Sequence, residues 1–126
     1  LEYIYDKLLE KIAETRPDRM AVETIFHSRS AKAALIMGHV RGVVLLAGAK
    51  AGLPVFEYTP LEITLSVVGS GAASKHQVQF MVSKMLSFSK KVPSDAADAI
   101  AVALCHLNKA SASRIISRAV SRGGSV

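Results

Sequence analysis

The feature of this sequence that most constrains its fold is a long helical segment between two short strand segments. Residues 20–23 (MAVE) and residues 54–58 (PVFEY) have the length and apolar composition of short buried strands. Between them, Ser30 can cap a helix that runs to about residue 51, where Gly52 ends it. A strand, a helix of about 20 residues and a second strand make a βαβ unit, whose strands run parallel. We therefore predict an α/β fold.

Four further segments are predicted to be helical. The first ends before Pro17, because the residue before a proline disfavours helical dihedrals. Ser74 and Gln77 have the spacing of a capping box, and Ser94 can cap the last helix. Three of these helices are predicted over residues 1–15, 75–86 and 95–107, and residues 60–65 could form the fourth, which would be short.

The chain is long enough for one domain, which we predict over residues 1–108. Residues 109–126 are rich in Ser, Arg and Gly, and we predict that they form a flexible basic tail. Two parallel strands do not make a stable sheet alone. We therefore expect either that further strands precede Leu1 or that a partner chain covers the sheet.

The charge balance favours an anionic partner. Lys and Arg number 16 against 10 Asp and Glu, which gives a formal net charge of +6. Nucleic acid is the partner that such a balance favours first, although a generic basic surface would have the same composition.

Cysteine usage and hydropathy favour a cytoplasmic protein. Cys105 is the only cysteine and lies in an apolar run, which indicates a reduced core residue. No signal-peptide pattern is present. The most apolar stretch, residues 42–49, is far shorter than the ~20 residues that span a bilayer. We therefore expect no membrane partner.

Three acidic residues are candidate metal ligands. Glu23 would end the first strand at its carboxyl end, where sites gather in open α/β sheets. Asp95 and Asp98 lie three residues apart and would share one helix face. Small apolar residues surround both, so we expect this face to pack closely and to bury two like charges, which a divalent cation offsets. Hard oxygen ligands favour Mg²⁺ or Mn²⁺, and a pair of such ions can support phosphodiester hydrolysis.

Each of these acids also has a simpler interpretation when it is taken alone. Glu23 could be a solvated residue at a strand end. Asp95 and Asp98 could be first-turn residues that offset the helix dipole. Two other kinds of catalytic site are disfavoured, because the four histidines lack zinc spacing and no G-x-S-x-G motif occurs.

Several residues could contact DNA. Phe26 follows the first strand and could stack on an unpaired base, or could be a core residue. Lys75 opens a helix after a loop of small residues whose backbone N–H groups could hold a phosphate. That loop consists of Gly69, Ser70 and Gly71. Further cations that could contact phosphates, or could simply be solvated, are Arg29, Lys32, Lys90 and Lys91.

The long helix has its own packing signal. Gly38 and Gly42 lie four residues apart, which allows another helix to approach closely. We expect this helix to pack against a helix or a subunit.

Taken together, these segments resemble the RuvC-type Holliday-junction resolvases. Five segments in the correct order, within residues 1–109, are more specific than any single motif. They are residues 16–26 (RPDRMAVETIF), 34–42 (ALIMGHVRG), 54–58 (PVFEY), 67–79 (VVGSGAASKHQVQ) and 95–101 (DAADAIA).

The resemblance implies a ribonuclease-H-like α/β fold, with a mixed sheet flanked by helices, and a homodimer formed through the long helix. It implies metal-dependent nicking of four-way DNA junctions in recombination and DNA repair, together with the RuvA and RuvB branch-migration proteins. Two Mg²⁺ or Mn²⁺ ions per site would be held by Glu23, Asp95 and Asp98. Lys75 would act beside them near the cut, and Phe26 would contact junction bases.

Two departures from the family pattern matter. The family's opening strand carries a Gly-Ile-Asp-Pro-Gly-like motif whose Asp completes the metal site, and no such motif occurs here. We therefore expect that strand and its two neighbours to precede Leu1, and the chain as given to be inactive or nearly so. The family also often has a lysine shortly before Val67, whereas residues 59–66 contain no Lys or Arg. Two alternatives stay open: a non-catalytic junction-binding module, and a ribonuclease-H-like nuclease for another substrate.

Overall fold

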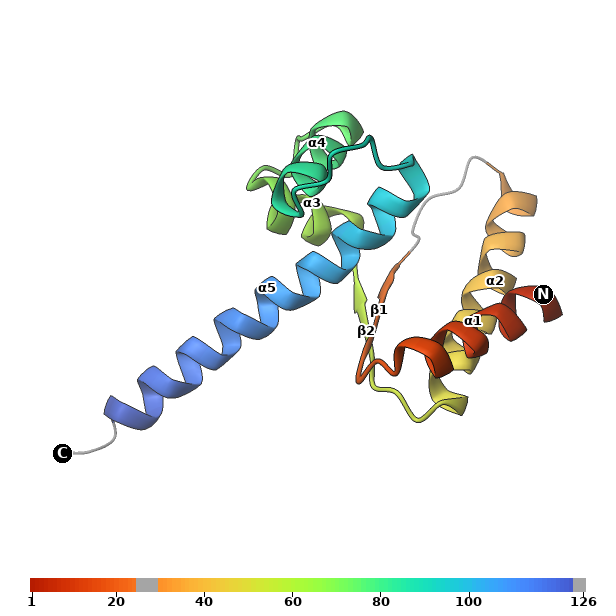
Figure 1. Ribbon diagram of the computed structural model, residues 1–126, viewed down its shortest axis with the longest axis horizontal. Coiled ribbons are helices and arrows are strands. Elements are labelled where there is room, and N and C mark those ends of the chain that lie inside the picture. Colours follow the sequence, from red (N-terminus) through yellow and green to blue (C-terminus); the bar gives the residue numbers. More distant parts are fainter. Residues whose placement is uncertain (25–29, 124–126) are drawn as a thin grey trace. The chain divides into compact units, whose positions relative to one another are not determined.

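A computed structural model describes residues 1–24 and 30–123 of the chain (Figure 1). It divides into two compact units, Leu1–Glu57 and Tyr58–Val126, so the division falls elsewhere than at the predicted domain boundary after residue 108. The elements in chain order are α1 (Glu2–Thr15), β1 (Met20–Glu23), α2 (Ala31–Lys50), β2 (Val55–Tyr58), α3 (Pro60–Val68), α4 (Lys75–Met85) and α5 (Ser94–Gly123).

The predicted βαβ unit is present, and with it the α/β fold. Strands β1 and β2 are hydrogen-bonded neighbours, and α2 connects them along the chain. The Met20 N–H donates to the Pro54 carbonyl at 3.0 Å at the start of the pair. Strand β2 begins at Val55, one residue later than predicted, because proline has no N–H for a strand ladder.

Helix α2 is fixed at its start by a side chain and near its end by a glycine. The Ser30 Oγ accepts from the Ala33 N–H at 3.1 Å, as the predicted cap requires. A Cβ atom at Gly48 would lie 3.0 Å from both the Met20 Sδ and the Val55 Cγ2. A larger residue at this position would therefore require the Met20 and Val55 side chains to shift by a few tenths of an ångström.

The glycines singled out in the sequence behave differently. Among the described residues, no atom lies within 4 Å of a Cβ built at Gly38 or Gly42. The close helix approach expected there is therefore not made within this part of the chain.

Helix α2 is rich in apolar residues. It has 20 residues, and an 18-residue window within it has a mean hydropathy of 1.4, so by length and composition alone it could cross a membrane. The apolar segment is therefore longer than residues 42–49, the stretch that the sequence analysis considered. This is weak evidence for a membrane span, because packed helices of other proteins have the same length and composition. Lys32 and Arg41 also lie within the helix.

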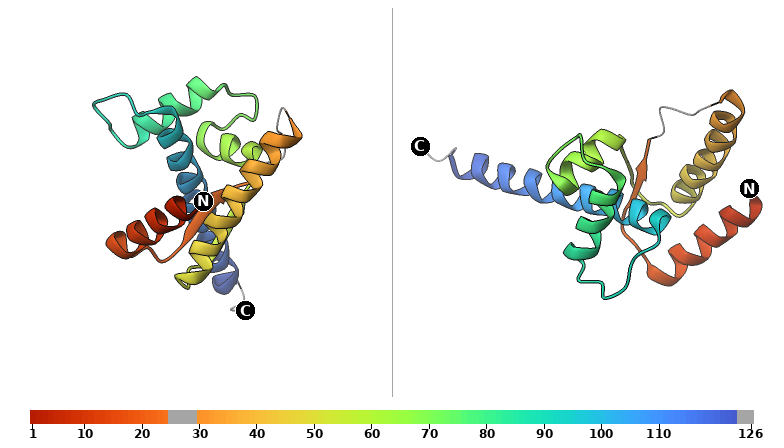
Figure 2. Two further views of the ribbon diagram at one scale, coloured as in Figure 1. Left: turned by 90° about the vertical axis from the view of Figure 1, so that its right-hand side faces the viewer. Right: turned by 90° about the horizontal axis from the view of Figure 1, so that it is seen from above.

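In the second unit, α3 and α4 pack against one another and against the first half of α5 (Figures 1 and 2). Both short helices begin with a capping box. Thr59 and Glu62 form one that the sequence analysis missed, and Ser74 and Gln77 form the predicted one. The buried core side chains of this unit are Tyr58, Ile63, Val67, Val78, Val82, Ala97, Ala101, Val102, Cys105 and His106.

Helix α5 differs from the prediction at both ends. It begins at Ser94 rather than Asp95, and the Pro93 carbonyl accepts from the Ala97 N–H at 2.9 Å. It continues to Gly123, so the predicted flexible tail is wrong for residues 109–123. Residues 109–122 contain neither glycine nor proline, and their Ala and Arg residues favour a helix despite the serines between them.

Candidate metal and DNA site

Two of the predicted site residues meet in the second unit. The Lys75 Nζ lies 2.9 Å from the Asp98 Oδ2. The capping box at Ser74 makes Lys75 the first residue of α4, and the packing of α4 on α5 brings it to the second turn of α5. The Lys75 side chain is 61% exposed and that of Asp98 is 38% exposed. Such an exposed pair contributes ~0–1 kcal/mol, so either member can exchange its partner at little cost.

The acids on α5 lie beside the packed face of the helix rather than on it. Ala97 and Ala101 are buried against the other helices, whereas Asp95 is exposed and Asp98 is half-buried. The expectation that two like charges are buried together is therefore wrong in this chain. Only Ala97 and Ala101 of the DAADAIA segment are buried, because they lie four residues apart on the packed face and their small size allows close helix packing.

The carboxylates provide part of a metal site. Among residues 1–24 and 30–123, no group of three or more His, Cys, Asp or Glu side chains could hold a metal ion. Asp95 and Asp98 offer carboxylate oxygens from one face of α5. Oxygen ligands suit a hard divalent cation, and these two residues would supply only part of its coordination shell. Glu23 belongs to the first unit, where it ends β1.

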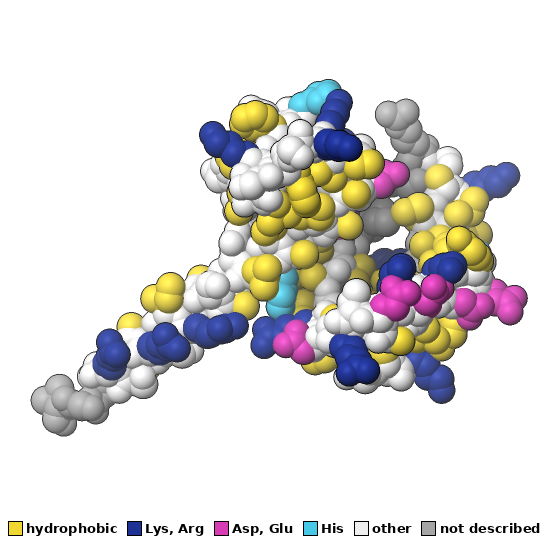
Figure 3. Space-filling view, in the orientation of Figure 1, with side chains coloured by type: hydrophobic (Ala, Val, Ile, Leu, Met, Phe, Trp, Pro, Cys, Tyr) yellow, Lys and Arg dark blue, Asp and Glu magenta, His cyan; other side chains and the backbone are white. Residues whose placement is uncertain are grey.

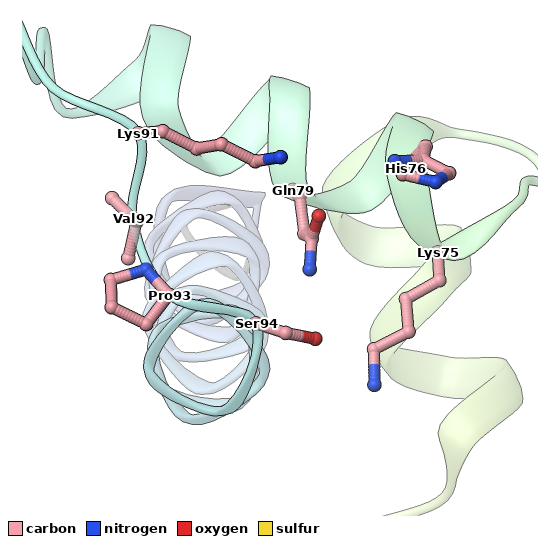
Figure 4. Close-up of a pocket in the computed structure, with 7 residues that line it drawn as sticks. All are labelled: Lys75, His76, Gln79, Lys91, Val92, Pro93 and Ser94. Atoms are coloured by element: carbon pink, nitrogen blue, oxygen red, sulfur yellow. The ribbon is translucent and has the colours of Figure 1, made fainter.

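A basic hollow lies beside the Lys75–Asp98 pair. It has a volume of about 440 Å³. Figure 4 shows Gln79 and Ser94 between the side chains of Lys75 and Lys91. The lining residues are Lys75, His76, Gln79, Lys91, Val92, Pro93 and Ser94. Two cations and several hydrogen-bonding groups suit a phosphate of a DNA backbone.

Of these lining residues, the sequence analysis missed His76 and Gln79. One available signal was spacing, because Lys75 and Gln79 lie four residues apart on α4 and so share a helix face.

The loop before α4 is less open to phosphate than expected. Gly69 ends α3 with a φ of +83°, and its N–H donates to the Leu65 carbonyl at 2.9 Å. That N–H is therefore already used by the helix. The Ser70 Oγ accepts from the Ala72 N–H at 3.4 Å, and a Cβ at Gly71 would lie 2.6 Å from the Leu61 Cδ1. Phe26 and Arg29, the other predicted DNA contacts, lie outside the described residues.

A second polar cluster joins α3 to α5. The Lys109 Nζ donates to Glu62 at 2.8 Å, and this bond, with help from the Thr59 N–H, lowers the pKa of Glu62 to about 2. The same carboxylate raises the pKa of Lys109. The Tyr58 Oη and the His106 Nδ1 form a buried hydrogen bond of 2.6 Å. Since these contacts tie α3 and the last residue of β2 to α5, they help to hold the helix that carries Asp95 and Asp98.

Burial also changes the pKa of Cys105, which lies on α5 one residue before His106. Desolvation raises the pKa of the Cys105 thiol. The thiol is fully buried, so it behaves as the reduced core residue that the sequence predicted.

Comparison with known proteins assigns the family. Residues 1–106 match the family model described as crossover junction endodeoxyribonuclease RuvC. A protein of that name from Desulforamulus reducens is 49% identical over 107 residues, which cover 84% of this chain and 66% of the relative. Another, from Syntrophomonas wolfei, is 45% identical over 125 residues, covering 98% of this chain and 73% of the relative. The chain thus spans about two thirds of the length of such relatives.

Two solved structures agree with this assignment. The RuvC of Thermus thermophilus matches with a TM-score of 0.81 and 35% identity, over 89% of this chain and 68% of that one. The same protein in complex with a Holliday-junction substrate gives a TM-score of 0.82 and 36% identity, over 86% of this chain and 67% of that one. The chain therefore belongs to the RuvC family of crossover junction endodeoxyribonucleases and has their ribonuclease-H-like α/β fold.

Proposed function

We propose that this chain is part of an endonuclease that resolves four-way DNA junctions by metal-dependent phosphodiester hydrolysis in recombination and repair. The observation that carries the proposal is the contact between Lys75 and Asp98. These residues belong to two separate segments of the family pattern, and the fold joins them beside a basic hollow. The related structure solved with a Holliday-junction substrate supports the substrate class.

The acidic residues would hold the metal. Asp95 and Asp98, with Glu23, would ligate Mg²⁺ or Mn²⁺, two ions per active site. When bound, such ions activate a water and stabilise the leaving oxygen. Lys75 neutralises Asp98 in the chain alone. On a DNA strand it would turn to the phosphate beside the cut, which frees the carboxylate for its ligand role.

The DNA would be held on both sides of this centre. Lys91 and Gln79 would bind a backbone phosphate in the hollow, and Phe26 would stack on an unpaired junction base. Further DNA contacts would come from the segment after β1 and from the loop before α4. These residues are Arg29, Ser70 and Gly71, whereas the Gly69 N–H already donates to the Leu65 carbonyl.

The partners follow from the same assignment. A homodimer would form through α2, whose residues Leu35, Ile36 and Leu46 are large, apolar and exposed in the chain alone. Gly38 and Gly42 on the same helix would allow the partner subunit's helix to approach closely. We also expect a cytoplasmic protein that works with the RuvA and RuvB branch-migration proteins.

The metal role is tested by binding rather than by cutting. Mn²⁺ titrated into the chain should broaden the NMR signals of α5 around Asp95 and Asp98 first. Asp98→Asn should raise the Mn²⁺ concentration that gives the same broadening at least tenfold, because one carboxylate ligand loses its charge. Asp6→Asn, on exposed α1, removes the same charge and should change nothing. Equal broadening in both variants would remove Asp98 from the metal site.

The DNA role is tested by affinity. The chain should bind a four-way junction at least tenfold more tightly than a linear duplex at the same salt concentration. Lys75→Gln should weaken junction binding several-fold, whereas Lys84→Gln, further along α4, should not. Equal affinity for junction and duplex would favour a nuclease for another substrate.

The catalytic prediction concerns this chain as it stands. The fourth carboxylate of the family pattern does not occur in the sequence. We therefore expect residues 1–126 alone to cut a junction very slowly or not at all. Robust Mg²⁺-dependent cutting by this chain would contradict that expectation. Junction binding by a longer form that cannot cut would favour the non-catalytic binding module.

A further inference from the structure

The last part of α5 extends beyond the packed core of the second unit. Residues 109–123, here called the C-terminal arm, follow the end of the family match at residue 106. Figure 1 and the right-hand view of Figure 2 show this part of the helix running past α3 and α4. Every residue from 111 to 123 is exposed, including Ile116 at 63% and Val120 at 70%. The arm therefore remains helical without a packing partner among the described residues.

The charge of the arm has one sign. No acidic residue follows Asp98 in the sequence. Arg114, Arg118 and Arg122 recur every four residues, so they form one stripe along the helix. Figure 3 shows a row of basic side chains along this part of α5. Lys109 is paired with Glu62, whereas none of the three arginines forms a salt bridge within the described part of the chain.

A stripe of serines lies beside the arginines. Each arginine directly follows a serine, so the hydroxyl groups occupy the neighbouring helix positions. These residues are Ser113, Ser117 and Ser121. Arginine forks and serine hydroxyls are both common donors to phosphate oxygens. The Ser121 Oγ donates to the Arg118 carbonyl at 3.0 Å. The donors that the polar half of the arm presents to a ligand are therefore chiefly the arginine N–H groups, and no acidic residue lies among them.

The spacing of the three arginines is compatible with the regular spacing of phosphates along duplex DNA. Four helical residues rise about 6 Å, so the three arginines span about 12 Å. Duplex DNA carries a phosphate about every 3.4 Å of axis on each strand, so each arginine can reach a separate phosphate.

The arm also lies at a useful distance from the candidate metal ligands. Arg114 and Arg122 are about 24 Å and about 36 Å from Asp98 along the same helix. At about 3.4 Å per base pair, that distance equals roughly 7 to 11 base pairs.

We propose that the C-terminal arm binds the backbone phosphates of a duplex arm of the junction, away from the cut. This inference rests on the proposed function, namely that the chain binds four-way DNA. A second copy of the arm is a poor occupant, because its arginines would repel those of the first. An anionic membrane would need a larger apolar face than the arm offers, because the large apolar residues of the arm are only Ile115, Ile116 and Val120.

The test removes the charge of the arm and keeps the helix. A triple variant, Arg114→Gln, Arg118→Gln and Arg122→Gln, preserves good helix formers. Junction affinity is measured over a salt series without divalent cations, and circular dichroism checks the helix content. We expect at least a tenfold loss of affinity at low salt, and a salt slope shallower by about 2 to 3, since each phosphate contact contributes about 0.9. The matched control changes three cations of the first unit to Gln: Lys7, Lys11 and Lys50.

The outcomes separate the arm from the proposed function. A triple variant that binds the junction with the wild-type affinity and slope overturns the inference and leaves the proposed function intact. An equal loss in the control variant also overturns it, because the effect is then one of net charge. If the wild type binds junction and duplex equally, the proposed function fails, while a weaker triple variant on duplex still supports the arm. Loss of binding only to vesicles of anionic lipid would overturn it in favour of a membrane surface.

Discussion

The two units of this chain differ sharply in how much they bury. In the second unit, the described residues form a core in which α3 and α4 cover one face of α5. In the described part of the first unit, only Ala47 and Gly48 are buried, although α1, α2 and the strands carry many apolar side chains. Leu35 and Ile36 on α2 remain exposed.

This difference indicates which unit would gain more stability if another protein surface covered its apolar side chains. A helix that exposes several large apolar residues loses their hydrophobic stabilisation unless another surface covers them. The second unit holds Lys75 and Asp98 in contact through its own packing, whereas the first unit needs further cover. The proposed homodimer through α2 would supply part of that cover.

The largest expected effect is in the core of the second unit. Val82 is fully buried, so Val82→Asp would place an unpaired charge in an apolar environment. We expect a loss of at least about 4 kcal/mol in the free energy of unfolding, measured by urea denaturation followed by circular dichroism. Leu35→Asp, at an exposed position of the first unit, is the matched control and should change stability by less than about 0.5 kcal/mol at monomer concentrations. Equal losses in the two variants would contradict the comparison between the units.

A smaller effect is expected from the buried hydrogen bond between Tyr58 and His106. Tyr58→Phe leaves the buried imidazole without this partner, which should cost about 1–3 kcal/mol of unfolding free energy. Tyr3→Phe removes the same hydroxyl from an exposed position on α1 and should have no measurable effect. An unchanged stability in Tyr58→Phe would mean that water replaces the hydroxyl.

The Glu62–Lys109 pair should make the second unit sensitive to pH. Because the pKa of Glu62 is lowered from 4.5 to about 2 on folding, its stabilisation is present above 4.5 and is lost as the pH falls through about 2. The raised pKa of Lys109 preserves the pair below 10.5, and stabilisation is lost as the pH rises past the raised value.

The measurement compares thermal unfolding of the wild type and Glu62→Gln across this pH range. The difference between them should be constant near neutral pH and should vanish at both extremes. Glu14→Gln, which breaks the exposed Lys11–Glu14 pair on α1, is the control in the first unit. A difference that stays constant down to pH 2 would show that the pair does not stabilise the fold.

The smallest effect is expected from the ion pair of the first unit between Arg41 and Glu57. Both side chains are partly exposed, so a double-mutant cycle with Arg41→Gln and Glu57→Gln should give a coupling below about 1 kcal/mol. The coupling should shrink further in 1 M salt, where exposed charges are screened. A larger, salt-independent coupling would indicate that this unit is better packed than its burial suggests.

Much of the fold follows from short-range signals in the sequence. Ser30 caps α2 and Ser74 opens α4, as predicted, because a capping side chain bonds to a backbone group within three residues. The strand, long helix and strand also follow from local pattern. The extent of α5 did not, since its serines suggested a loose tail although no residue in 109–122 breaks a helix.

The sequence by itself determined the βαβ unit, the family pattern and the candidate ligands Glu23, Asp95 and Asp98. Only the tertiary structure decided that Lys75 meets Asp98, that the carboxylates of α5 lie beside the buried face, and that Gln79 joins the basic hollow. The physical reason is the distance along the sequence between the residues that interact. A cap or a helical period depends on residues a few positions apart, whereas the Lys75–Asp98 contact depends on how two complete helices pack.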